Sequence, residues 1–143
     1  MTRKRIIVDL HLIVCDRGKI LMGLRKNTGF CDGMYSVPAG HVMQRESILE
    51  AAAREAYEEV GLGTSPKRLL VVGTMHRRST EGRIDFFVEA ERWSGDPRNM
   101  ELHKCDEVDW FPTSCLPSDT IPYIRHALLK IDPPPWFEEY QLP

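Results

Sequence analysis

The order of apolar and polar residues along the chain predicts a series of β-strands. Runs rich in Ile, Val, Leu and aromatic residues predict four strands, at 5–15, 19–24, 69–75 and 84–91, and two shorter ones at 35–37 and 108–111. The Asp16-Arg17-Gly18 turn separates the first two, so we expect them to form a hairpin. Glycines and a proline within 27–40 predict a loop around the short strand.

A second, helical periodicity follows this loop. Ser47 and Glu50 have the spacing of a capping box, which predicts that a helix begins near Ser47. Gly61 or Gly63 would end it, and a second helix is expected over 121–129. The residues that would face the core are Leu49, Ala52, Ala53, Ala56 and Val60. These elements predict a mixed α/β (α+β) domain with helices packed on a sheet.

The 143 residues fit one domain, which we place at 1–132. The remaining segment, 133–143, begins Pro133-Pro134-Pro135-Trp136 and cannot form a regular helix or a central strand. We expect this Pro-rich tail to pack across the domain or a partner subunit, which would suit a homodimer.

Composition and charge narrow the function classes. A hydrophobic content of 42% and a charged content of 28% are ordinary for a soluble globular protein. The net charge of −2 gives no reason to expect a nucleic-acid polymer or a membrane as partner. Asp9 interrupts the first apolar run, which leaves it too short for the apolar region of a signal peptide or for a membrane-spanning helix. Four scattered cysteines favour free thiols, so the predicted location is cytoplasmic.

An acidic cluster on the first helix carries the candidate chemistry. Glu55, Glu58 and Glu59 stand at i, i+3 and i+4, so their carboxylates share one face and repel one another. No lysine or arginine follows at i+4 to relieve them. A divalent cation with oxygen ligands, such as Mg²⁺, is the natural partner, whereas a solvated acidic surface is the alternative. Arg54 could hold a carboxylate by a bidentate pair, and the Gly40 carbonyl could join the metal site.

The spacing Gly40-x5-Glu46-x7-Arg54-Glu55-x2-Glu58-Glu59-x-Gly61 resembles the Nudix box. Further segments, at 93–97, 107–111 and 116–117, are similar to those of MutT-like members of that family. The resemblance implies an α/β/α sandwich with a mixed β-sheet, Mg²⁺ or Mn²⁺ held by the loop and helix of the box, and hydrolysis of a nucleoside diphosphate linked to another group.

The resemblance also assigns roles to individual residues. The implied metal ligands are Gly40, Glu55, Glu58 and Glu59. Catalytic roles are expected for Arg54, which orients a carboxylate, and for Glu58 or Glu59 as general base. Glu107 is the preferred base outside the box, with Glu101 behind it. Arg25 and Glu46 are assigned to substrate binding, although Arg25 could be a surface residue and Glu46 could stabilise the loop.

The favoured function is a Mg²⁺-dependent hydrolase of nucleoside triphosphates that releases a nucleoside monophosphate and pyrophosphate. The alternatives are a hydrolase of nucleotide sugars or ADP-ribose, and a non-catalytic nucleotide-binding module. Asp119-Thr120 stands where a relative that removes oxidised dGTP has a base-contacting asparagine. His76, Arg77 and Arg78 are expected to lie in a solvated turn, with phosphate or base contact as the alternative.

Overall fold

The computed structural model of the chain describes residues 1–130 and 133–142. Two α-helices, one short 3₁₀ helix and nine strands are found within these residues. The strands are β1 (Ile7–Ile13), β2 (Cys15–Asp16), β3 (Lys19–Arg25), β4 (Tyr35–Ser36), β5 (Ala39–His41), β6 (Leu69–Arg78), β7 (Arg83–Ala90), β8 (Cys105–Pro112) and β9 (Trp136–Gln141). The helices are α1 (Ile48–Val60), η1 (Pro66–Arg68) and α2 (Pro122–Leu128).

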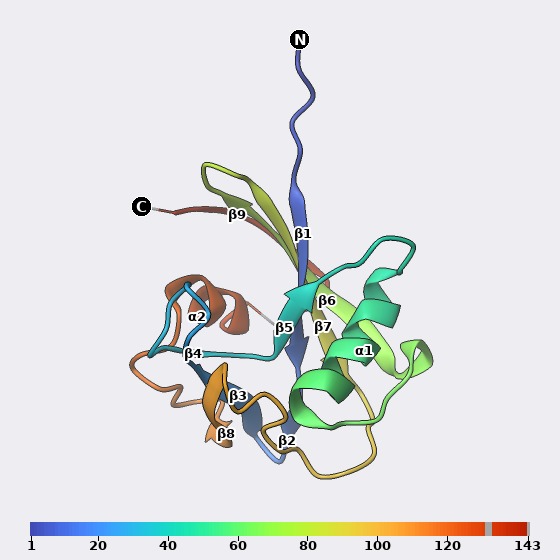
Figure 1. Ribbon diagram of the computed structural model, residues 1–143, viewed down its shortest axis with the longest axis vertical. Helices are drawn as coiled ribbons and strands as arrows, with labels where there is room; N and C mark the ends of the chain where they lie inside the picture. The colour runs from blue at the N-terminus through green and yellow to red at the C-terminus, as the bar shows by residue number, and fades with distance from the viewer. Residues whose placement is uncertain (131–132, 143) are drawn as a thin grey trace.

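The strands form two sheets (Figure 1). The larger has the order β5-β1-β7-β6-β9 and is mixed, because β1 and β7 run parallel, as do β6 and β9. The smaller joins β2, β4 and β8 to β3 through antiparallel pairs. The sequence predicted a single mixed sheet with helices, and it did not indicate this division into two sheets.

Helices cover opposite faces of the larger sheet. Side chains along β1 point alternately to these two faces and so join two separate cores. Leu10 and Leu12 pack with the alanines of α1, whereas Ile13 packs with Phe87 and with Ile124 of α2. Figure 1 shows α1 and α2 on either side of the strands. The predicted α/β/α layering is therefore observed.

The predicted hairpin of the first two strands is wrong for most of its length. β1 pairs with β5 and β7 in the larger sheet, and only Cys15 and Asp16 pair back onto β3. The chain thus passes from one sheet to the other just after Ile13. An apolar strand whose residues 9–13 are buried on both faces is typical of a central strand of a mixed sheet rather than of a hairpin arm.

The predicted limits of α1 are confirmed. Ser47 caps the helix, and Ser47 and Glu50 form both hydrogen bonds of a capping box. Gly61 ends the helix with a positive φ of 72°, a conformation that glycine adopts without strain. The helical pattern missed two buried residues of α1, the fully buried Ala51 and the largely buried Glu55.

The tail supplies an edge strand that was not predicted. β9 runs parallel to β6, and Trp136 lies against Gly73, where an added Cβ would be 2.0 Å from the indole ring. The predicted domain boundary at 132 lies outside the described residues. Within residues 1–130 and 133–142, no helix combines the length and apolar character that crossing a membrane requires.

Candidate active site

Arg54 organises the acidic face of α1. Its Nε and Nη2 donate to the two carboxylate oxygens of Glu46 at 2.7 and 3.0 Å, which is the bidentate pair considered from the sequence. Its Nη1 donates to Glu55 at 2.7 Å and to Glu58 at 3.1 Å. Arg54 thus supplies a cation one turn before Glu58, whereas no lysine or arginine follows the three acids at i+4.

The loop before α1 is held against these acids. Gly40 lies so close to Glu55 that an added Cβ would be 2.2 Å from the carboxylate. The backbone N–H of Ala39 donates to Glu59 at 2.9 Å, and Arg54 Nη2 donates to the carbonyl of His41 at 3.0 Å. The strand β5 thus brings the Gly40 backbone beside two of the predicted metal ligands.

The surroundings of Glu55 and Glu59 disfavour the charged forms of these two carboxylates. Burial raises the pKa of Glu59 well above its usual range, and the charges of Glu55 and Glu101 raise it further. Burial also raises the pKa of Glu55, although the hydrogen bond from Arg54 opposes this change. Arg54 alone therefore leaves this group of carboxylates short of positive charge.

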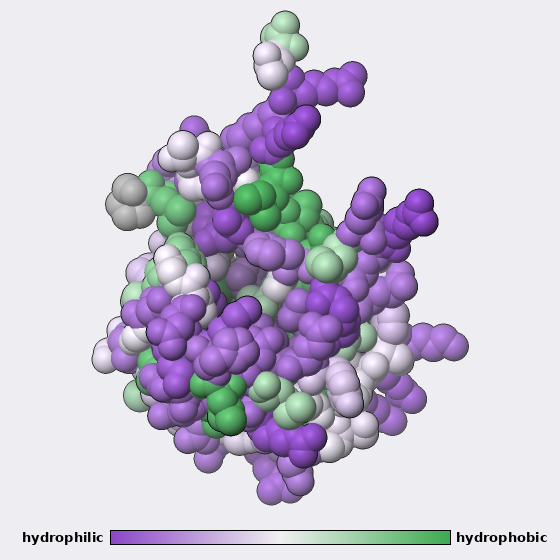
Figure 2. All heavy atoms as spheres, viewed as in Figure 1, coloured by the Kyte–Doolittle hydropathy of each residue, from purple (hydrophilic) through white to green (hydrophobic). Residues whose placement is uncertain are grey.

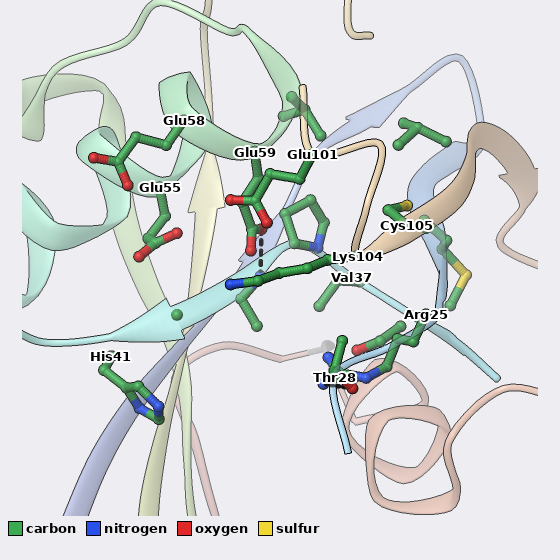
Figure 3. A pocket seen from close by; sticks show the side chains of 18 of the residues that line it. Arg25, Thr28, Val37, His41, Glu55, Glu58, Glu59, Glu101, Lys104 and Cys105 are labelled. Atoms are coloured by element: carbon green, nitrogen blue, oxygen red, sulfur yellow. Dashed lines mark hydrogen bonds between the residues drawn. The ribbon is translucent and has the colours of Figure 1, made fainter. Parts of the chain in front are cut away.

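A cavity of about 500 Å³ opens beside these residues (Figure 3). We call it the acidic cavity, because four carboxylates line it: Glu55, Glu58, Glu59 and Glu101. Arg25 and Lys104 line it as well, and Figure 3 shows Lys104 extending across it below the glutamates. Among the described residues, neither cation forms an ion pair with a carboxylate. Figure 2 shows that hydrophilic residues dominate this face around its hollowed middle.

Glu101, rather than Glu107, is the acid that the chain outside the box brings to this cavity. Val108 of β8 lines the cavity, whereas its neighbour Glu107 points to the other face and accepts a 2.7 Å hydrogen bond from the Tyr35 hydroxyl. Sequence reasoning placed Glu107 first and missed Lys104. A polar loop carries no periodicity that could have indicated which of its side chains turn inward.

A second cavity of about 350 Å³ adjoins the first and shares Arg25, Ser36 and the β5 backbone with it. We call it the arginine cavity, because Arg25, Arg77 and Arg83 line it. The predicted solvated turn at 76–78 is wrong, since these residues end β6 and Arg77 is only 3% exposed. Arg77 Nε lies 3.0 Å from Asp85 Oδ2, and Arg83 donates to Asp9 at 2.6 Å.

A family profile described as the NUDIX domain matches residues 5–129.

The chain belongs to the Nudix family.

Two relatives of the chain have hydrolytic names. The 8-oxo-dGDP phosphatase NUDT18 of Danio rerio is 27% identical over 143 residues, which are 94% of this chain and 42% of that protein. The NAD-capped RNA hydrolase NudC of Chromobacterium violaceum is 31% identical over 120 residues, which are 83% of this chain and 43% of that protein. The chain spans less than half the length of either relative. Both names support the prediction of a Nudix enzyme.

Solved Nudix structures confirm the fold. The MutT NUDIX hydrolase of Burkholderia pseudomallei matches with a TM-score of 0.80 at 25% identity, over 89% of this chain and 98% of that one. The MutT protein of Methanosarcina mazei Go1 matches with a TM-score of 0.77 over 92% of this chain and 96% of that one, and at 21% identity it supports the fold alone. The predicted resemblance to MutT-like Nudix members is therefore confirmed.

The Nudix box residues fit a divalent cation, although they are not arranged as a finished site. Within residues 1–130 and 133–142, no three His, Cys, Asp or Glu side chains converge as a ready metal site. Arg54 engages Glu55 and Glu58, and the Ala39 N–H engages Glu59. The partly buried carboxylates and the close approach of Gly40 to Glu55 nevertheless supply hard oxygen ligands of the kind that Mg²⁺ prefers.

Three further residues named from the sequence, Glu46, Asp119 and Thr120, line neither cavity. Glu46 lines neither cavity; it pairs with Arg54 and accepts a 2.9 Å bond from the Met43 N–H, so it braces the Nudix loop. Asp119 and Thr120 do not line either cavity, and the Thr120 hydroxyl donates a 2.6 Å hydrogen bond to the carbonyl of Pro117. The arginine cavity is lined by residues of six strands (β1, β3, β4, β5, β6 and β7), of α2 and of the loop that follows β3.

Proposed function

We propose that the chain is a Mg²⁺-dependent hydrolase of nucleoside triphosphates, which releases a nucleoside monophosphate and pyrophosphate; Mn²⁺ would serve in the same site. The acidic cavity carries this proposal, because it sets four carboxylates opposite two cations that have no carboxylate partner among the described residues. Carboxylates recruit the metal, and free cations recruit phosphate oxygens. A solvated acidic surface would need neither the cavity nor the opposing cations.

Residues of the Nudix box would hold the metal. The Gly40 carbonyl, Glu55, Glu58 and Glu59 are the proposed ligands, with Arg54 keeping the carboxylates in place. When bound, the metal neutralises phosphate oxygens and makes a water more acidic.

The chain's other residues position the substrate and take up the proton. Arg25 and Lys104 would hold phosphate oxygens from the opposite side of the cavity. The oxygen of a water would attack phosphorus as the bond to the bridging oxygen breaks, and pyrophosphate would leave. The proton of the water would pass to a carboxylate. Glu58 and Glu101 are the candidates, and the Glu101 carboxylate has no hydrogen-bond partner among the described residues.

A hydrolase of another nucleoside diphosphate derivative is the second candidate. The adjoining arginine cavity supports it, because about 350 Å³ offers room for a distal group. The names of the relatives point to several such substrates, namely 8-oxo-dGDP and NAD-capped RNA. A non-catalytic module has less support, since every acid of the box is present and three of them line the cavity.

Release of phosphate and pyrophosphate from a panel of nucleotides, with and without Mg²⁺, tests the proposal. The panel holds NTPs, dNTPs, 8-oxo-dGDP, ADP-ribose, NAD and nucleotide sugars. We expect metal-dependent release of pyrophosphate from triphosphates. Turnover of the diphosphate derivatives alone would move the substrate class to the second candidate, and no turnover of any of them would contradict an enzymatic role on these nucleotides.

A further inference from the structure

Glu101 and Lys104 reach the acidic cavity from an irregular segment, 98–104, which leads into β8. The N–H groups of Lys104 and Cys105 both donate to the Glu101 carbonyl, at 2.9 and 3.0 Å, so residues 101–105 form one tight turn. The two hydrophobic cores are built from other segments of the chain. The direction in which this turn presents its side chains is therefore set by hydrogen bonds rather than by packing.

Asn99 holds this turn at both of its ends. The Asn99 Nδ2 donates to the Cys105 carbonyl at 2.7 Å, and the Asn99 Oδ1 accepts from the Glu101 N–H at 3.0 Å. A backbone N–H can only donate and a carbonyl can only accept, so these two partners fix the orientation of the amide. Asn99 is partly buried and lines neither cavity, so any contribution that it makes to the site passes through the turn.

The segment is also docked onto the end of α1. The Arg98 N–H donates to the Val60 carbonyl at 3.0 Å, and the Met100 N–H donates to the Glu59 carbonyl at 3.1 Å. These carbonyls belong to the last turn of the helix, where the helix itself offers them no donor. Figure 3 shows Glu101 beside Glu59, and the charge of Glu101 raises the pKa of Glu59.

The position of Glu101 requires such a restraint. Its carboxylate and that of Glu59 repel each other, and among the described residues no ion pair holds Glu101 in place. A turn without side-chain hydrogen bonds would relax so as to carry Glu101 away from the helix and into solvent. Lys104 would move with it, because both residues belong to the same turn.

We propose that Asn99 is a positioning residue of the active site, which holds the turn at 101–105 so that the Glu101 carboxylate and the Lys104 ammonium face the substrate; this inference rests on the proposed function. Asn99 takes no part in the reaction itself. The position requires one side chain that both donates and accepts, which asparagine supplies. Aspartate retains only the acceptor, and alanine retains neither group.

A double-mutant cycle tests whether Asn99 acts through Glu101. With Mg²⁺ and a nucleoside triphosphate, we expect Asn99→Ala to lower kcat by about 10²-fold, because displacing a catalytic group by about 1 Å can cost that much. In a Glu101→Gln background, the same change should lower kcat by less than about threefold, while KM still rises through Lys104. A loss of folded protein would instead lower kcat by the same factor in both backgrounds. Equal factors, or a normal kcat for Glu101→Gln alone, would overturn the inference.

Two further variants separate positioning from an effect on folding. Asn99→Asp keeps the acceptor for the Glu101 N–H but cannot donate to Cys105, and it carries the cycle if circular dichroism shows that Asn99→Ala is unfolded. Ser94→Ala is the matched control, because Ser94 lies in the same connection between β7 and β8, donates to the Gly63 carbonyl at 3.4 Å and lines neither cavity. We expect a normal kcat for Ser94→Ala. A loss as large as that of Asn99→Ala would overturn the specific role of Asn99.

Amide hydrogen exchange separates this inference from the proposed function, because it needs no turnover. In Asn99→Ala, the amides of Glu101 and Lys104 should exchange about tenfold or more faster than in the wild type, whereas the amide of the buried Leu10 should be unchanged. Faster exchange at the turn without hydrolysis of any triphosphate would reject the proposed function and support the restraint by Asn99. Unchanged exchange at Glu101 would overturn the inference even if triphosphates are hydrolysed.

Discussion

The two cavities on either side of β5 are built from opposite surpluses. The acidic cavity gathers four carboxylates, of which Arg54 engages only Glu55 and Glu58, and burial raises the pKa of Glu59 there. The arginine cavity gathers three guanidinium groups, of which Arg77 and Arg83 pair with Asp9 and Asp85 while Arg25 pairs with neither. A surplus of carboxylate calls for a cation. Under the proposed function, the metal and the phosphates would occupy the first cavity, and the second would have room for a distal group of the substrate.

The largest expected effect is the loss of stability on replacing Asp85, which is buried beside the arginine cavity and pairs with Arg77. Asp85→Ala removes the carboxylate that accepts from Arg77 and His11, which leaves a buried guanidinium without its main partner. Breaking a buried ion pair costs on the order of 3–5 kcal/mol. Urea unfolding followed by circular dichroism measures the loss. The matched control is Arg78→Ala, whose exposed side chain should contribute less than about 0.5 kcal/mol; similar losses in both variants would show that the buried pair is not special.

Substitution of a carboxylate in the acidic cavity should have the opposite effect: activity should fall while stability is retained. The Glu58 side chain is 52% exposed, so Glu58→Gln should leave the fold nearly unchanged. We expect turnover to fall by about 10²-fold or more, which corresponds to about 2.7 kcal/mol in the transition state. Steady-state kinetics beside a thermal melt measures both. Glu91→Gln, a change at an exposed acid that lines neither cavity, is the control. Near-normal turnover of Glu58→Gln would remove Glu58 from the site.

The general base can be assigned by a parallel change. Glu101→Gln keeps the size of the side chain but removes its ability to take a proton, so a loss of about 10²-fold or more in kcat is expected if Glu101 is the base. Glu107→Gln provides the comparison, because Glu107 lies on the other face of β8 and contacts Tyr35. A larger loss in Glu107→Gln than in Glu101→Gln would contradict the placement of the site.

Strand β5, which lines both cavities, should be sensitive to one added methyl group. In Gly40→Ala, the new Cβ would be 2.2 Å from the Glu55 carboxylate, so either β5 or the carboxylate must move. Overpacking of this kind costs about 1–3 kcal/mol, and we expect metal-dependent turnover to fall with stability. Gly29→Ala is a useful comparison, because nothing lies within 4 Å of its Cβ, although its φ of 83° adds backbone strain of its own. Unchanged metal dependence in Gly40→Ala would contradict the role of its carbonyl.

The smallest effect is stabilisation by Mg²⁺ alone. A cation that binds only the folded protein at ten times its Kd adds about 1.4 kcal/mol to the free energy of unfolding. We expect Mg²⁺ to raise Tm through the acidic cavity, and this rise should disappear in Glu59→Gln but persist in Arg77→Lys. A rise of the same size in all three proteins would place the cation elsewhere.

Short-range spacing explains how much of this could be predicted. The box from Gly40 to Gly61 lies on the end of β5, one loop and one helix, so the positions of Glu55, Glu58 and Glu59 follow from helical periodicity and the cap at Ser47. The arginine cavity has no such spacing. Asp9, Arg77 and Asp85 come from three strands, and the parallel pairing that places Asp9 opposite Asp85 is not visible in either strand alone. A charged residue inside an apolar strand was the available signal, because it requires a buried partner.

The same reasoning explains the errors in the strands. The hairpin was predicted from a turn at Asp16-Arg17-Gly18, which does join β2 to β3, but the turn says nothing about the partners of β1. β9 followed three prolines that forbid a helix, yet an edge strand begins directly after them at Trp136. Local sequence located most strands but missed the last three residues of β6, and long-range pairing decided which strands meet.

The most direct test of the account is ³¹P NMR of a nucleoside triphosphate incubated with the protein and Mg²⁺. We expect resonances of a nucleoside monophosphate and pyrophosphate, both absent when the metal is chelated and strongly reduced in Glu58→Gln. A nucleoside diphosphate and inorganic phosphate, or product formation that does not depend on the metal, would contradict it.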